Sequence, residues 1–199
     1  MSRGALAIAG MAAACWSASA AELTTALSKD NQTIVTVSGK LADGDAARFR
    51  NILKTSATAG KPVSVVRLNS PGGSLFEGAR LAAVIHVAKV KTSITAGATC
   101  AGACFLPFIA GTQKFVSTTA TVAVPGAAEK SEHQPAGNTP ALVQSDKPAI
   151  VRIVQNLGLL DAIVSRMLAT SEDATFPLTL DDLRAMGATT IGKPPPPPR

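Results

Sequence analysis

A turn of glycine, proline and small polar residues between two apolar segments is the feature that most constrains the fold of this chain. Residues 65–68, Val-Val-Arg-Leu, are a strand signal, and residues 69–74, Asn-Ser-Pro-Gly-Gly-Ser, form a turn directly after it. Residues 75–87 then follow a helical period, and residues 92–95 are again rich in β-branched side chains. Strand, glycine turn, helix and strand in succession predict an α/β domain.

A second turn of small residues follows the first at a fixed distance. Residues 96–104 are Ala-Gly-Ala-Thr-Cys-Ala-Gly-Ala-Cys, and the apolar segment after them ends at Gly111. Together with residues 68–74 and the Glu-Gly pair at 77–78, this pattern resembles the Clp protease proteolytic subunit and the wider crotonase-like superfamily, in particular exported members with a Cys-x-Ser-x-Cys motif. The resemblance covers roughly residues 33–191 and implies a single α/β domain built as a spiral of ββα repeats.

The resemblance also implies catalytic positions, and this chain departs from them. In the family, the backbone N–H groups at Gly73 and Ala103 form an oxyanion hole, and the nucleophilic serine stands where this chain has Gly102. A continuation without a gap puts the general-base histidine where this chain has Pro125. Glycine has no hydroxyl and the proline side chain cannot accept a proton. We therefore expect the fold without serine-peptidase activity.

Two other residues are weak candidates for the missing catalytic groups. His133 lies in a Glu-His-Gln-Pro sequence that echoes the family's His-Gln-Pro, but it reaches the base position only with an eight-residue insertion. Asp173 is the acid nearest to Thr175, where the third member of the family's triad would fall, but it is out of register. Both are expected to be loop or helix-start residues. The other histidine, His86, is expected on or beside the buried face of the 75–87 helix.

Two cysteines remain if the N-terminal segment is removed. The i,i+4 spacing of Cys100 and Cys104 would place their Cα atoms roughly 6 Å apart on one helix face, which a disulfide tolerates. The resemblance favours that disulfide, and the alternative is a pair of small buried thiols. Two thiols on one helix without a nearby histidine leave metal coordination incomplete, so no metal site is expected.

The N-terminal segment predicts an export signal over residues 1–21. A positive charge precedes a short apolar core, and residues 18–21, Ala-Ser-Ala-Ala, are typical of a cleavage site. The apolar core is shorter than the roughly 20 residues that a membrane-spanning helix needs. We therefore expect a periplasmic or secreted protein with no membrane association after removal of the signal, a domain over 22–192, and a solvated polyproline II tail over 193–199.

Apolar periodicity predicts further elements along the chain. We expect strands at 33–37, 112–116 and 120–124, a helix at 46–53, and a long helix from 147 to 168 in which Gly158 is a candidate break. The resemblance implies assembly into trimers or rings, and the apolar stripe of the long helix suits such contacts.

Three functional hypotheses remain. The net charge of +6 is spread over dispersed basic residues and aromatic residues make up only 4% of the chain, so a nucleic-acid partner is not expected. The first hypothesis is an inactive binding or interaction module, whose partner is another protein or a second copy. The second is a crotonase-like enzyme that uses only the oxyanion hole. The third is a peptidase whose nucleophile has moved to Ser70, Ser74 or a reduced Cys104. None of the three requires a cofactor.

Overall fold

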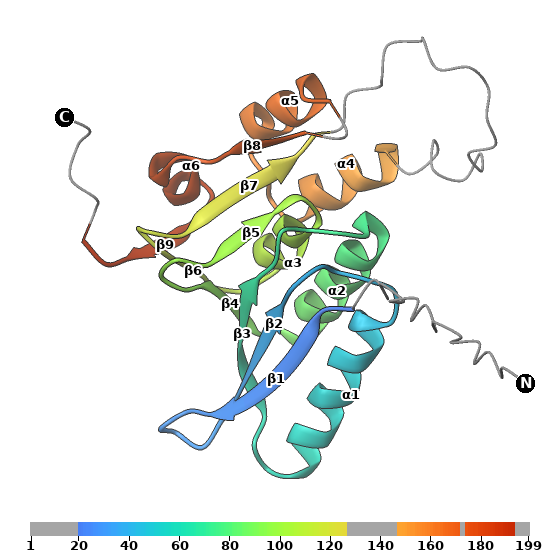
Figure 1. The fold of residues 1–199 in the computed structure, drawn as a ribbon, viewed down its shortest axis with the longest axis vertical. Coiled ribbons are helices and arrows are strands. Elements are labelled where there is room, and N and C mark those ends of the chain that lie inside the picture. Colours follow the sequence, from blue (N-terminus) through green and yellow to red (C-terminus); the bar gives the residue numbers. More distant parts are fainter. Residues whose placement is uncertain (1–19, 127–146, 172–173, 194–199) are drawn as a thin grey trace, which may run out of the picture.

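The computed structural model describes residues 20–126, 147–171 and 174–193, and these residues form two sheets (Figure 1). In the larger sheet β1 pairs antiparallel with β2, and the remaining neighbours pair in parallel. In the smaller sheet the central strand β7 runs parallel to β5 and antiparallel to β8. The order in the larger sheet is β1 (Glu22–Leu27), β2 (Thr33–Ser38), β3 (Val63–Asn69), β4 (Lys91–Ile94), β6 (Lys114–Ser117) and β9 (Ala188–Ile191), and in the smaller sheet β5 (Thr99–Ala101), β7 (Thr121–Pro125) and β8 (Thr175–Pro177).

Helices connect the parallel strands, as such strands require. Figure 1 shows α1 and α2 side by side along one face of the larger sheet, where they join β2 to β3 and β3 to β4. No described helix is long and apolar enough to cross a bilayer. The helices are α1 (Asp45–Thr58), α2 (Leu75–Ala88), the 3₁₀ turn η1 (Gly102–Cys104), α3 (Phe105–Ile109), α4 (Lys147–Asn156), α5 (Asp161–Ala169) and α6 (Leu180–Ala185).

The ends of α2 follow from local chemistry, and so does the orientation of β2. The hydroxyl of Ser74 accepts a hydrogen bond from the Glu77 N–H at 3.3 Å and so caps the first turn of α2. The helix ends at Lys89, whose φ of 52° breaks the helical path. In β2 alternate residues are buried, which is the pattern of a strand with one face on the core. The predicted strand at 33–37 and helix at 75–87 are thereby confirmed.

The helix expected from 147 to 168 is interrupted at Gly158, its candidate break. The chain forms two helices there, α4 and α5, and Gly158 between them has a φ of 80°. Glycine reaches this left-handed conformation without the steric penalty that other residues meet, so the helix stops here. The apolar stripe is only partly available to a partner, because Val154, Ile163 and Val164 are at most 5% exposed and pack inside the chain, whereas Leu168 is 47% exposed.

Three further expectations change. Strand β1, which sequence reasoning did not predict, forms the edge of the larger sheet, and its mostly exposed side chains explain why no apolar alternation marked it. Residues 99–101 are a strand, β5, rather than part of a helix. His86 is exposed, because the buried face of α2 is formed by Leu81, Ala82 and Ile85 with their neighbours.

Candidate functional site

The two glycine-containing turns predicted from the sequence touch through their main chains. Ser70, which follows β3, forms a parallel bridge with Cys100 of β5, so the turns that follow these strands lie together. A Cβ atom added to Gly72 would lie 2.9 Å from the carbonyl oxygen of Ala101 and 3.1 Å from the nitrogen of Ala103. No side chain fits between backbones this close, so position 72 accepts only glycine.

The conformation of Gly73 is set by its contact with Leu41. The Leu41 N–H donates to the Gly72 carbonyl at 2.7 Å, and the Ser74 N–H donates to the Leu41 carbonyl at 2.9 Å. These two bonds flank Gly73, which is exposed and has a φ of 137°. Within the described part of the chain, the N–H of Gly73 itself donates no hydrogen bond. Gly73 therefore presents an unengaged donor at the surface of the turn.

Ala103 is held from the other side by α2. A Cβ added to Gly78 would lie 2.5 Å from the Ala103 carbonyl oxygen, so this helix packs directly against the Ala103 backbone. Ala103 lies in the first turn of η1, where a helix leaves its N–H groups without partners, and no described group accepts from it. The structure thus brings together the turns that carry the two predicted oxyanion-hole residues. That these N–H groups bind an oxyanion stays a prediction.

The positions where the resemblance puts a catalytic triad also converge. A Cβ at Gly102 would meet Cγ2 of Thr175 at 3.9 Å and the Pro71 carbonyl oxygen at 3.7 Å, both ordinary contact distances. Thr175 in β8 is in turn the register partner of Pro125 in β7. Positions 102, 125 and 175 therefore surround one point, and they supply neither an imidazole nor a carboxylate. The only side-chain hydroxyl among the three belongs to Thr175.

A disulfide links the residues on either side of Gly102, Cys100 and Cys104. Cys100 and Cys104 are bonded with an S–S distance of 2.04 Å and a Cα–Cα distance of 5.2 Å, and both residues are fully buried. The expected helix face is wrong, because Cys100 lies in β5 and Cys104 in η1. The bond therefore closes the strand-to-helix turn around Gly102 and fixes the backbone that presents Ala103.

Solved structures share this arrangement of strands and helices. A mutant of ClpP1 from Listeria monocytogenes matches over 82% of this chain and 93% of its own, with a TM-score of 0.56 at 19% identity. A mutant of the membrane-bound stomatin-specific protease 1510-N matches over 76% of this chain and 74% of its own, with a TM-score of 0.54 at 15% identity. The chain has a Clp protease/crotonase-like fold.

A third structure, described as that of an enzyme, matches over 80% of this chain and 96% of its own, with a TM-score of 0.60 at 13% identity. No protein-family model and no curated protein matches the sequence. The Clp-like assignment therefore describes the fold, while function has to be argued from the site.

The serines proposed as relocated nucleophiles have structural roles in this Clp-like fold. Ser70 is 1% exposed, and its hydroxyl accepts from the Gly72 N–H at 3.1 Å and donates to the Gly72 carbonyl at 3.3 Å. The Ser74 hydroxyl caps α2. Among the described residues, no hydrogen bond joins the His86 imidazole to a serine or a cysteine. His133 and Asp173 lie outside the described residues.

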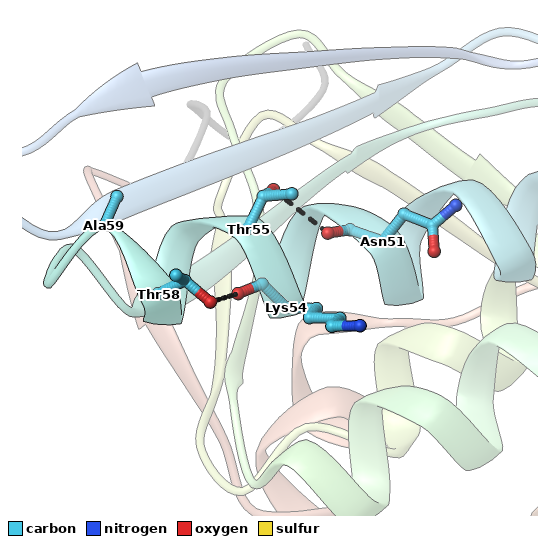
Figure 2. A pocket seen from close by; sticks show the side chains of 5 residues that line it. All are labelled: Asn51, Lys54, Thr55, Thr58 and Ala59. Carbon is cyan, nitrogen blue, oxygen red and sulfur yellow. Dashed lines mark hydrogen bonds between the residues drawn. The ribbon is translucent and has the colours of Figure 1, made fainter.

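A surface depression on α1 is lined by exposed residues whose threonine hydroxyls bond to the backbone of their own helix. Figure 2 shows it on the exposed face of α1, where the Thr55 hydroxyl donates to the Asn51 carbonyl and the Thr58 hydroxyl to the Lys54 carbonyl, each at 3.0 Å. The described residues also contain no group of three or more His, Cys, Asp or Glu placed to hold a metal ion. The turn pair is therefore the better candidate site. The depression is lined by Asn51, Lys54, Thr55, Thr58 and Ala59.

Proposed function

We propose that this protein is an exported Clp-like protein that has lost serine-peptidase activity and acts as a binding or association module. The observation that supports this most strongly is the convergence of Gly102, Pro125 and Thr175 beside a complete turn pair. Acyl transfer by a triad needs a nucleophile and a base within hydrogen-bond reach of each other. Gly102 supplies no nucleophile and Pro125 no base, so a ligand carbonyl held here would be bound without being cleaved.

Export is the part of this proposal that rests on the leader alone. Residues 1–21 have the charge, apolar core and small-residue site of a secretion signal. We propose a periplasmic or secreted location. A disulfide between Cys100 and Cys104 is compatible with such an oxidising compartment.

An exposed stripe on α2 supports association with a protein partner. Phe76, Arg80, Ala83 and Val87 follow the i, i+4, i+7, i+11 spacing of one helix face, and all four are exposed. Phe76 is 56% and Val87 80% exposed, and the Arg80 guanidinium lies 4.0 Å from the centre of the Phe76 ring. Large apolar groups gathered on one exposed face favour a protein contact. We propose that this stripe, rather than α4 and α5, mediates self-association into a trimer or ring.

A crotonase-like enzyme is the second candidate. The observation that favours it is that the N–H groups of Gly73 and Ala103 donate to no described group, so they could stabilise an oxyanion without a nucleophile. A peptidase with a relocated nucleophile has less support, because Ser70 and Ser74 are engaged in the turn and the cap and Cys104 is in a disulfide.

Hydrolysis assays distinguish these functions. We expect the purified exported protein to cleave neither a fluorescein-labelled unfolded protein nor p-nitrophenyl esters nor an acyl thioester. Turnover that disappears in Ser70→Ala, Ser74→Ala or Cys104→Ala would identify a relocated nucleophile. Turnover that survives in all three would favour the oxyanion-hole enzyme, and either result would overturn the inactive module.

Sedimentation tests the association. We expect the natural protein to self-associate and the Phe76→Ser/Val87→Ser variant to sediment as a monomer. Leu27→Ser is the matched control, because Leu27 is an apolar residue with 54% exposure on β1 rather than on α2. A monomeric natural protein, or dissociation caused equally by Leu27→Ser, would contradict the proposed role of the stripe.

A further inference from the structure

A fully buried carboxylate lies at the start of α1. Asp45 is the first residue of α1, and its side chain is 0% exposed. Its Oδ2 accepts from the Ala42 N–H at 2.9 Å, and its Oδ1 forms an ion pair with Arg48 Nη2. A buried carboxylate is stable only when its oxygens are paired. The Asp45 carboxylate has one further hydrogen-bond partner, in addition to Ala42 and Arg48.

That partner is the main chain of Ala21. The Ala21 nitrogen lies 3.3 Å from Asp45 Oδ2, and the Ala21 carbonyl oxygen accepts from Arg48 Nη2 at 2.7 Å. Ala21 is 1% exposed and directly precedes β1. The Asp45–Arg48 pair is thus hydrogen-bonded to both the backbone nitrogen and the backbone oxygen of Ala21.

The same residue is the last of the expected signal segment, residues 1–21, and a cut after Ala20 would shorten that segment by one residue. Residues 18–20, Ala-Ser-Ala, have the small–x–small pattern that signal-processing peptidases cut after. Hydrolysis of the Ala20–Ala21 bond consumes one water, leaves a carboxylate on Ala20, and converts the nitrogen of Ala21 from an amide N–H to an α-ammonium. That ammonium would carry a positive charge and three donors where the intact chain has one neutral donor.

We propose that Asp45 is the internal docking site for the α-ammonium of Ala21 that cleavage after Ala20 creates. This inference rests on the proposed export and adds to it the exact residue that must become the N-terminus. A charge-assisted hydrogen bond from an ammonium to a buried carboxylate is stronger than the hydrogen bond from the neutral amide N–H that it replaces. Processing therefore strengthens a contact that the fold has already formed. Arg48 holds the terminal residue in register through its carbonyl.

The docked terminus would also support the turn pair. Ala42, which donates to Asp45, follows Leu41, and Leu41 is hydrogen-bonded to Gly72 and Ser74 on either side of Gly73. On the other side of Asp45, the Ala46 N–H donates to Glu77 Oε1 of α2 at 2.7 Å. The ammonium site is therefore connected to the Gly73 turn both through Leu41 and through α2, as a positioning contact.

The first test uses the full chain, expressed with its own leader and recovered from the exported fraction. Intact mass is expected to correspond to residues 21–199. Retention of the leader would refute export itself, whereas a chain beginning at any residue other than Ala21 would refute the docking site and leave export standing.

The second test measures whether the α-ammonium is sequestered. At neutral pH, modification of the Ala21 amine by a limiting amine-reactive ester is expected to be at least about tenfold slower in the folded protein than in urea, because the donor is buried and ion-paired. Asp45→Asn is expected to abolish this protection. Asp43→Asn, which removes the same charge from an exposed position of the same loop, is expected to keep it.

A third variant avoids the case in which Asp45→Asn fails to fold. Two glycines inserted between Ala20 and Ala21 keep Asp45 intact but move the ammonium away from it. We expect this chain to have a reactive N-terminus and a melting temperature lower by about 4 °C or more, the size of shift that loss of a charge-assisted bond gives in a chain this long. An unprotected amine in the natural protein, or an unchanged melting temperature with the insertion, would overturn the proposal.

Discussion

The Cγ2 methyl of Thr175 lies 3.9 Å from the point that a Cβ atom would occupy at Gly102. The two residues are 73 positions apart in the sequence and meet because Thr175 extends β8 alongside Pro125 at the end of β7. A methyl group therefore faces a position without a side chain where the resemblance expects a carboxylate and a nucleophile. Positions 102 and 175 therefore lie together, and their side chains supply neither a nucleophile nor a carboxylate.

Gly73 should be the least replaceable residue of the turn pair. A Cβ at this position would lie 2.7 Å from the Leu41 nitrogen and closer still to the Leu41 carbonyl oxygen, in a backbone conformation with a φ of 137°. We expect Gly73→Ala to lower the free energy of unfolding by about 3 kcal/mol or more, or to prevent folding. Urea unfolding of the purified variant measures this.

Gly97→Ala is the matched control for that substitution. Gly97 also has a positive φ, 72°, but no atom lies within 4 Å of its added Cβ. Only the backbone penalty applies, so we expect a loss of about 1 kcal/mol. Equal losses at the two positions would mean that the contact with Leu41 is not as close as the structure has it.

The disulfide should stabilise the fold modestly. Chain entropy predicts about 2 kcal/mol for a loop as short as Cys100 to Cys104. We expect the free energy of unfolding measured in urea to fall by that amount when a reductant is present throughout. The Cys100→Ala/Cys104→Ala variant should show no response to reductant. If the free energy of unfolding of the natural protein is also unchanged by reductant, Cys100 and Cys104 are not bonded.

The start of α6 makes a prediction about acid stability. The Thr179 backbone N–H, which donates to the Asp182 carboxylate at 2.9 Å, holds the pKa of that group below its usual value, with smaller contributions from the Thr179 hydroxyl and Arg166. Because the folded pKa is depressed, the contribution to stability is complete above the unfolded value of 3.8 and is lost as the pH falls below it.

Asp182→Ala tests this contribution. We expect it to cost about 1 kcal/mol at pH 7, the usual value of a helix cap, and the difference from the natural protein to shrink as the pH falls toward 3. Asp181→Ala is the control, because Asp181 is 92% exposed and, among the described residues, its ion pair is with Arg184 of its own helix. A cost for Asp182→Ala that is independent of pH would contradict the assignment.

Much of the fold could be predicted because two local sequence patterns indicated where the backbone makes close contacts. The glycines at 72 and 73 and the small residues at 100–104 mark backbones that approach closely, and the structure shows them in contact. The helix break at Gly158 was visible only as a candidate, since an apolar stripe continues across a break as readily as through one helix. Strand β1 was missed because an edge strand with exposed side chains has no apolar alternation.

The Asp45–Ala21 contact could not have been predicted in the same way. At the start of a helix an aspartate is ordinary capping chemistry, so the residue type carries no sign that it is buried. Its partner lies 24 residues away and contributes only a backbone nitrogen, which no sequence motif records. Contacts between a side chain and a distant main chain depend on the packing of α1 against β1, which only the folded chain shows.

Fluorophosphonate labelling tests the central claim most directly. The natural protein should not be labelled, and Gly102→Ser/Pro125→His, with Thr175→Asp added as a third change, should be labelled at position 102. Gly102→Ala/Pro125→His/Thr175→Asp is the control, with the same backbone strain and no hydroxyl at position 102. Labelling restored by these changes would establish a correctly placed triad site without its groups. Labelling of the natural protein would contradict the account, because a serine or threonine other than those assigned here would then be activated.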